Sequence, residues 1–160
     1  MRHIFSCFIL LISNFTHANS IKTNSGLVTN VFDGDTIEIT SNNQKQIIRL
    51  AYIDAPEINQ KHGDRAKRNL TKTMLNKDIN FKILDQDIYK RNIAVVFLGK
   101  TNMNKKQIHD GYAWASNRSS SNSYLSLELR AKYYKKGLWQ SKSHLSPWEF
   151  RKKYISDNIR

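Results

Sequence analysis

The chain has 160 residues, with 26 Lys and Arg against 13 Asp and Glu, and a formal charge of +13. This length suits one domain with one hydrophobic core, and a single cysteine, Cys7, excludes a fold held together by disulfide bonds. The charge favours an anionic partner. Nucleic acid, an anionic membrane surface and acidic glycans all fit, so the charge leaves the choice among them open.

The N-terminal segment has the layout of a secretory signal peptide. A polar start at residues 2–3 precedes an almost unbroken apolar run over residues 4–12, which is too short to span a bilayer. Ala18 offers a small residue for cleavage. We expect a signal peptide over residues 1–18, export to the periplasm or the medium, and no stable membrane association after cleavage. The alternative is an uncleaved membrane anchor. A loose polar leader is expected over residues 19–25.

Three antiparallel strands are expected next. Residues 27–32 are rich in apolar side chains and end at Asp33-Gly34, a strong turn pair. Residues 36–40 and 46–53 alternate between apolar and polar side chains, as strands with one buried face do. In the last of these strands, Arg49 lies on the face opposite to the apolar side chains.

Two more strands and three helices complete the expected domain. They are a helix over 64–76, strands over 79–83 and 93–98 separated by a polar loop, a helix over 102–109, a polar linker over 119–123 and a helix over 124–138. This order makes an α+β protein and is compatible with a five-stranded OB-fold β-barrel, although pattern alone does not prove that the barrel closes. We place the domain at residues 26–150 and a basic C-terminal tail at residues 151–160.

Carboxylates are scarce in this chain, and several of them gather at two turns. Asp33 and Asp35 flank a glycine, and Asp54 and Glu57 bracket Ala55-Pro56 just after the third strand. Carboxylate oxygens are suitable ligands for calcium or magnesium, and a Glu beside such an ion can accept a proton from water. The same residues also suit ordinary turns, so their spacing alone leaves both interpretations open.

Two arginines could complete a site for a phosphodiester. Arg49 and Arg91 offer forked donors that match phosphate oxygens and stay charged at any working pH. Either could equally be a basic residue of the surface.

Three segments, in order, resemble the motifs of the staphylococcal nuclease (thermonuclease) family. Residues 31–36, Val-Phe-Asp-Gly-Asp-Thr, resemble the first motif, and residues 48–57, Ile-Arg-Leu-Ala-Tyr-Ile-Asp-Ala-Pro-Glu, are similar to the second. Residues 87–91 occupy the place of the third. Gly137-Leu138-Trp139 and residues 147–150 resemble exported Gram-negative members. The likeness covers roughly residues 27–150.

The resemblance implies an OB-fold barrel with three helices and a calcium ion. Asp35 and Asp54 would bind Ca²⁺ through their carboxylates, and Ala55 would supply its backbone carbonyl where family members often carry Thr. Glu57 would position or deprotonate the attacking water. Arg49 and Arg91 would together clamp the scissile phosphate and stabilise its transition state.

Tyr89 and Lys90 are the substrate-binding residues that the resemblance implies. Tyr89 would lie near the nucleotide end of the cleft. Lys90 departs from the family, which usually has Gly at this position. If the backbone there needs a positive φ, a lysine costs roughly 1 kcal/mol or more.

We therefore predict an exported, monomeric, calcium-dependent nuclease that cuts DNA and RNA with little regard for sequence and leaves 3′-phosphates. One alternative is a non-catalytic exported OB-fold module that binds single-stranded nucleic acid. Another is a cationic protein that binds acidic glycans or membranes. Neither alternative needs the acidic cluster.

Overall fold

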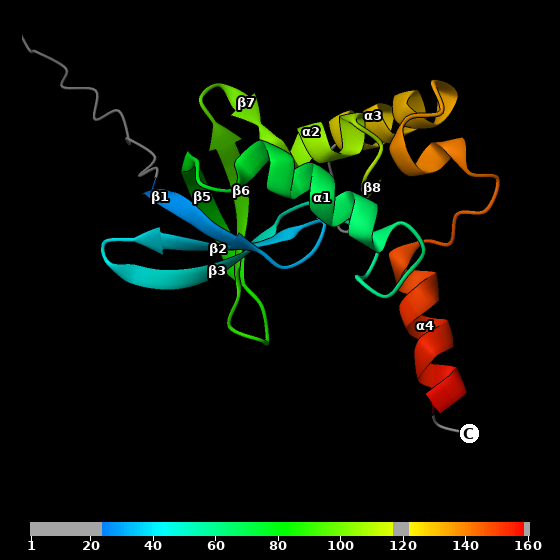
Figure 1. Ribbon diagram of the computed structural model, residues 1–160, viewed down its shortest axis with the longest axis horizontal. Helices are drawn as coiled ribbons and strands as arrows, with labels where there is room; N and C mark the ends of the chain where they lie inside the picture. The colour runs from blue at the N-terminus through cyan, green and yellow to red at the C-terminus, as the bar shows by residue number, and fades with distance from the viewer. Residues whose placement is uncertain (1–23, 117–121, 159–160) are drawn as a thin grey trace, which may run out of the picture.

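The computed structural model describes residues 24–116 and 122–158 (Figure 1). The predicted signal peptide over residues 1–18 lies outside the described residues, as does most of the predicted linker over 119–123. No helix in the described part of the chain is long and apolar enough to cross a bilayer.

Five strands close into a barrel, as the sequence predicts. They are β1 (Asn24–Val31), β2 (Thr36–Ser41), β3 (Gln44–Leu50), β5 (Asp78–Gln86) and β6 (Asn92–Leu98). The strands are antiparallel in the order β3-β2-β1-β5-β6, and a parallel pairing of β3 with β6 closes the barrel. The short β7 (Thr101–Asn102) extends the sheet beside β6, and β4 (Ile53–Asp54) pairs with β8 (Trp114–Ala115). The α+β OB-fold prediction is confirmed.

The described residues form four α-helices rather than the three predicted. They are α1 (Gly63–Met74), α2 (Met103–His109), α3 (Asn122–Tyr133) and α4 (Pro147–Asn158), with a 3-10 helix η1 (Gly137–Gln140) after α3. The predicted helix over 124–138 is too long, because Lys135 adopts a left-handed backbone with φ 51° and the chain restarts in η1. Residues 151–158, which the sequence suggested as a tail, continue α4.

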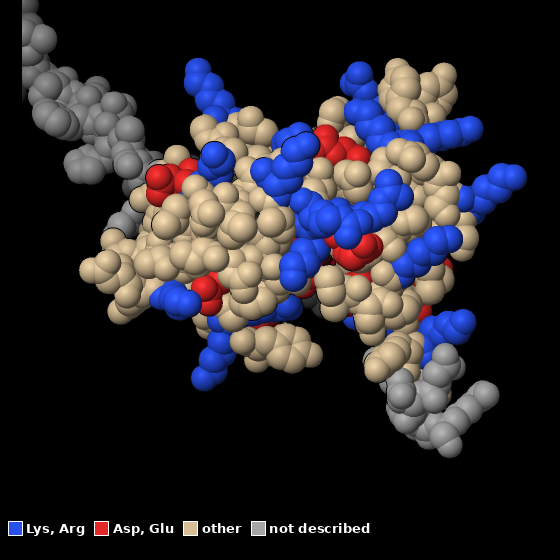
Figure 2. All heavy atoms as spheres, viewed as in Figure 1, with Lys and Arg blue, Asp and Glu red and all other residues tan. Residues whose placement is uncertain are grey.

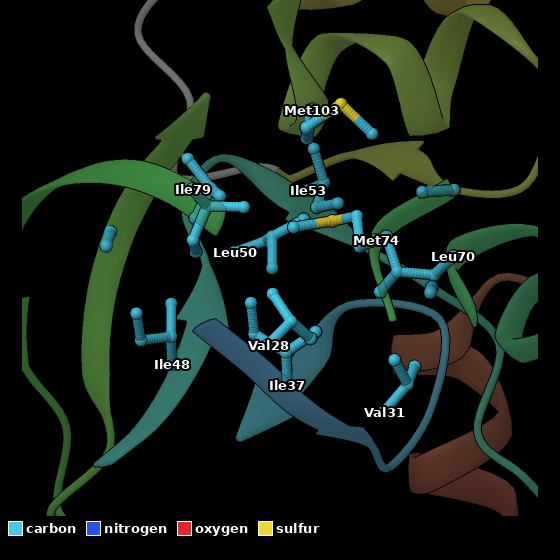
Figure 3. Packing of buried hydrophobic residues seen from close by; sticks show 14 of the residues in the cluster. Val28, Val31, Ile37, Ile48, Leu50, Ile53, Leu70, Met74, Ile79 and Met103 are labelled. Atoms are coloured by element: carbon cyan, nitrogen blue, oxygen red, sulfur yellow. The ribbon is translucent and has the colours of Figure 1, made fainter. Parts of the chain in front are cut away.

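The core lies inside the barrel and under α1. Alternate residues of β2 and β3, including Ile37 and Leu50, are fully or almost fully buried, while α1 contributes Leu70 and Met74. Figure 3 shows these side chains meeting one another. Each such side chain stabilises the fold by about 1.5–3 kcal/mol through burial. The predicted alternation of the strands and the four-residue spacing of α1 are both confirmed.

The third strand ends earlier than predicted, and this break shapes the site. Leu50 donates from its backbone N–H to the carbonyl of Asp35 (2.8 Å), and Ala51 donates to the carbonyl of Ala94 (2.8 Å). Tyr52 then takes φ 67°, and its carbonyl accepts from the N–H of Ser116 (2.9 Å). The chain turns there, so Asp54 lies on β4 at the end of the barrel and not on a continuation of β3.

Candidate active site

A cleft of about 1180 Å³ opens at one end of the barrel. Its walls come from the β1–β2 turn, the segment after β3, the β5–β6 loop and α4. In Figure 1 the β5–β6 loop and α4 project on the same side of the barrel. The cleft is lined by seven of the eight residues that the sequence predicted for the site, namely Asp35, Arg49, Asp54, Ala55, Glu57, Tyr89 and Arg91. Lys90 is exposed and is not part of this lining.

The β1–β2 turn holds Asp35 in a buried position. Asp33 caps the turn by accepting from the N–H of Asp35 at 2.9 Å. A side chain at Gly34 would stand 2.6 Å from Cβ of Ala55 and 2.7 Å from Cβ of Ala66, so only glycine lets this turn pack against α1 and the second motif. The carboxylate of Asp35 accepts from the N–H of Ala55 at 2.6 Å. The Asp-Gly-Asp sequence therefore fixes the first carboxylate against the second turn.

Arg49 joins the two acidic turns. Its guanidinium lies 2.7 Å from Oδ2 of Asp35 and 2.9 Å from Oδ1 of Asp54, and it also donates to the carbonyl of Ile53 (3.3 Å). Both carboxylates are almost completely buried, at 4% and 7% residue exposure. The predicted orientation of Arg49 away from the barrel core is confirmed, and the side chain reaches the acidic pair.

Burial is the largest single influence on the pKa of Asp35 and on that of Arg49. Burial raises the pKa of Asp35 to about 8, with the guanidinium of Arg49 acting in the opposite direction and Asp33 adding to the rise. Burial works against the charged form of Arg49, yet Asp35 and Asp54 raise the pKa of that guanidinium. A buried carboxylate with a raised pKa is one that a cation would stabilise in its ionised form.

The β5–β6 loop places Arg91 through Asp87. One oxygen of Asp87 pairs with Nε of Arg91 at 2.7 Å, and the other accepts from the backbone N–H groups of Arg91 (2.9 Å) and Tyr89 (3.0 Å). Burial acts to raise the pKa of the Asp87 carboxyl. The hydrogen bonds from Arg91 outweigh this effect and hold that pKa below its usual range. The ring of Tyr89 lies under the guanidinium, 5.4 Å from its carbon.

Lys90 has the positive φ that the family's glycine suggested, at 62°. This backbone costs a lysine about 1–2 kcal/mol relative to the right-handed conformation. The loop closes nonetheless, because the N–H of Lys90 donates to the carbonyl of Asp87 (2.9 Å) and the N–H of Asp87 donates to the carbonyl of Arg91 (3.0 Å). Lysine at this position therefore does not displace Arg91 from the cleft.

Arg151 forms an ion pair with Glu57 in the lining of the cleft. Arg151, on α4, lies 2.7 Å from Oε1 of Glu57 and 2.7 Å from Oδ2 of Asp54. Arg151 is absent from the site residues predicted from the sequence, because the expected tail begins at this position. The signal that could have found it is the resemblance over residues 147–150, which ends one position earlier.

The cleft is acidic although the chain is strongly basic. Figure 2 shows Lys and Arg side chains spread over the face that carries α1 and α2. The cleft, in contrast, is lined by three arginines and by six acidic residues, namely Asp33, Asp35, Asp54, Glu57, Asp85 and Asp87. A phosphate would be repelled from such a lining unless a cation neutralised part of it.

The donors present fit a hard divalent cation. Asp35 and Asp54 offer carboxylate oxygens within reach of one guanidinium, and Ala55 belongs to the same turn as Asp54. Calcium and magnesium take such oxygen ligands. Among the described residues no set of three or more His, Cys, Asp or Glu side chains is arranged around a common metal position. A cation here would therefore rest on two carboxylates, with backbone, water or substrate oxygens completing its shell.

Comparison with known proteins identifies the family. The sequence profile described as "Staphylococcal nuclease homologue" matches residues 47–141. The chain belongs to this family. The matched region runs from β3 to just past η1 and contains the second and third motifs, whereas the Asp35 turn and α4 lie outside it.

Individual relatives cover more of the chain. An "Uncharacterized endonuclease" of Haemophilus influenzae is 33% identical over 153 residues, which cover 94% of this chain and 86% of that protein. A "Micrococcal nuclease" of Shigella flexneri is 31% identical over 139 residues, or 79% of this chain and 80% of the relative. "Protein ParB" of Escherichia coli is 31% identical over 147 residues, or 84% and 82%. The resemblance drawn from the three motifs is confirmed.

Proposed function

We propose that this cleft hydrolyses phosphodiester bonds of DNA and RNA with calcium bound, with little regard for base sequence, and leaves 3′-phosphates. The chain is an endonuclease by its family and by its relatives, which are named endonucleases and micrococcal nuclease. The dependence on calcium, the range of substrates and the position of the cut are the new parts of the proposal.

One observation carries the metal part of the proposal. Asp35 and Asp54 converge on Arg49 from two separate turns, in a cleft where acidic side chains outnumber arginines. Those carboxylates, with the carbonyl of Ala55, would hold the ion. When bound, calcium would offset the negative charge of the lining and draw electron density from the phosphate.

Glu57 and the two arginines would act on the phosphate. Glu57 would accept a proton from the water that attacks phosphorus. As the new P–O bond forms, the bond from phosphorus to the 5′-oxygen breaks, and the leaving oxygen takes a proton from solvent. Arg49 and Arg91 would bind the other phosphate oxygens through their forks and stabilise the extra charge of the five-coordinate transition state.

The substrate range follows from which groups face the cleft. Carboxylates and guanidiniums address phosphate and sugar, which carry no sequence information directly. Tyr89 is 74% exposed at the rim of the cleft. Its ring could therefore contact any base or sugar. These features support a nuclease that accepts both DNA and RNA.

Digestion of end-labelled single-stranded DNA and RNA tests the proposal. We expect cleavage of both with calcium, no cleavage with a chelator, and 5′-labelled fragments whose gel mobility changes after treatment with a 3′-phosphatase because they end in 3′-phosphates. Asp54→Asn should abolish cleavage, whereas Asp78→Asn, an exposed carboxylate at the start of β5, should not. Full activity in chelator would remove the metal from the mechanism, and intact but retarded substrate would favour the binding module.

We also propose that the protein is exported and acts outside the cytoplasm. The proposal rests on the apolar run over residues 4–12 and on the small residue Ala18. N-terminal sequencing of the protein from a bacterial host should find Asn19 first. A retained Met1 in a membrane fraction would support the uncleaved anchor instead.

A further inference from the structure

Arg151 binds the two acidic residues that matter most to the proposed chemistry. Its guanidinium donates to Glu57 Oε1 (2.7 Å), to Asp54 Oδ2 (2.7 Å) and to Asp54 Oδ1 (3.2 Å). The Glu57 side chain is 36% exposed and sits in a loop, so without a partner it would sample several rotamers. The fork of Arg151 supplies that partner and also screens the repulsion between the two carboxylates.

The start of α4 is tied directly to the loop that carries Glu57. The buried side chain of Gln60 accepts from the N–H of Glu57 (3.2 Å) and donates to the carbonyl of Leu145 (2.7 Å). Ser146, also buried, then begins the helix by exchanging hydrogen bonds with Glu149, an arrangement that satisfies the first backbone donors of a helix. Arg151 follows within that first part of α4. Its position relative to Glu57 is therefore fixed twice, by its own ion pair and by Gln60.

We propose that Arg151 is a positioning residue for the nuclease reaction, which holds the carboxylate of Glu57 beside Asp54 and aims it into the cleft. The inference rests on the proposed function, in which Glu57 accepts a proton. Arg151 also adds a positive charge next to Asp54, so it lowers the affinity of the acidic pair for a divalent cation. A variant that lacks this charge should therefore bind a divalent cation more tightly but orient Glu57 less well.

Arg151→Gln separates this role from a structural one. The variant should bind calcium more tightly, with a dissociation constant lower by about tenfold, because a unit charge next to the site is gone. Its kcat should fall by about 10- to 100-fold, because Glu57 loses its orientation, while KM changes by less than about threefold. Arg151→Lys should keep the calcium affinity of the natural protein and recover part of kcat, because a single ammonium can replace the charge but not the fork.

Lys152→Ala is the matched control, since it removes one positive charge from the neighbouring, exposed position of α4. It should leave all three quantities unchanged. Calcium alone is titrated by calorimetry without nucleic acid, and cleavage is followed at saturating calcium on a single-stranded oligonucleotide. Circular dichroism and the melting temperature of each variant report on whether α4 remains folded.

Several results would overturn the inference. One is an unchanged or weaker calcium affinity in Arg151→Gln; another is a rise in KM with kcat preserved, which would make Arg151 a phosphate ligand. Recovery of full kcat by Arg151→Lys would show that charge alone is needed. If the natural protein does not cleave with calcium, the proposed function fails, whereas an unaltered kcat in Arg151→Gln beside an active natural protein refutes the positioning role alone.

Discussion

Arg49 Nη1 lies 2.7 Å from Asp35 Oδ2, although Arg49 lies on the second strand of the β2–β3 hairpin and Asp35 lies in the β1–β2 turn just before that hairpin begins. The register of that hairpin explains the contact, because Arg49 is paired with Thr36, the residue that follows Asp35. A guanidinium that is held by Asp35 and Asp54 is not available to a phosphate. Under the proposed function, a cation on Asp35 and Asp54 would displace Arg49 from these two side chains, which would couple binding of the metal to release of Arg49 for the substrate.

The first prediction concerns the pH dependence of stability and calcium binding. Burial raises the pKa of Asp35 to about 8, whereas an aspartate of the unfolded chain titrates near about 4. Between these values the metal-free folded protein holds a proton that the unfolded chain has released, so its stability falls as pH rises through that window. Under the proposed function calcium would bind the ionised carboxylate, so its apparent affinity should rise by up to tenfold per pH unit and level off above about pH 8.

Calorimetric titration with calcium at pH 6, 7, 8 and 9 checks the affinity, and urea denaturation in chelator checks the stability. The amide of the Asp35→Asn variant cannot ionise, so the stability of this variant should lack the fall with rising pH that the carboxyl causes. Equal calcium affinity at pH 6 and pH 8 would contradict the prediction.

The second prediction concerns Arg49 and Arg91, the two arginines that we propose bind the phosphate. Arg49→Lys and Arg91→Lys should each lower kcat/KM by about 10²- to 10³-fold, because an ammonium cannot reproduce the forked contacts of a guanidinium in the transition state. Arg68→Lys, an exposed residue of α1 that pairs with Asp64, should stay within about twofold of the natural protein. A near-normal rate in either cleft variant would remove that arginine from the mechanism.

Local pattern was enough to predict the strands and the two acidic turns, whereas the closure of the barrel and the joining of those turns in one site were implied by the family resemblance. The alternation around Ile37 and Leu50 fixes which face of each strand is buried, and with it the outward direction of Arg49. The turn at Asp33-Gly34 follows from its own sequence. These features depend on neighbours within a few residues, and the structure reproduces them.

Features that depend on distant contacts could not be predicted in the same way. Tyr52 takes a left-handed backbone that tyrosine rarely adopts, and the hydrogen bond from Ser116 to its carbonyl comes from a segment far along the chain. Arg151 reaches the cleft because Gln60 binds the carbonyl of Leu145, 85 positions later. No periodicity near residue 150 encodes that contact, so the sequence pattern leaves Arg151 outside the predicted domain.

The third prediction concerns Asp87, which holds Arg91 by its side chain and its backbone. Asp87→Asn should lower kcat/KM by about 10- to 100-fold, the loss expected when hydrogen bonds to a charged group are weakened. Asp85→Asn removes the same charge from the cleft lining without touching Arg91, so its effect should be less than about threefold. Steady-state cleavage of one oligonucleotide by both variants makes the comparison. Equal losses in the two would mean that charge, and not the placement of Arg91, determines the rate.

The fourth prediction concerns Gly34, which lets the Asp35 turn approach the second motif. In Gly34→Ala the new methyl group would meet Cβ of Ala55 at 2.6 Å and Cβ of Ala66 at 2.7 Å, and both neighbouring atoms are attached directly to backbone. We expect a loss of about 1–3 kcal/mol in the free energy of unfolding, as overpacking of a buried site causes. Because the turn must shift, Asp35 moves relative to Asp54, and calcium affinity should fall as well.

Gly99→Ala provides the control for this last effect. Gly99 has φ +57°, and no atom lies within 4 Å of the place that a methyl group would take, so the substitution should cost about 1 kcal/mol through backbone strain alone. It lies far along the chain from both acidic turns and outside the cleft lining, so calcium affinity should stay that of the natural protein. Urea denaturation measures the stability of both variants, and calorimetry measures their calcium affinity. A destabilised Gly34→Ala that binds calcium normally would show that the distance between the two turns does not control the metal site.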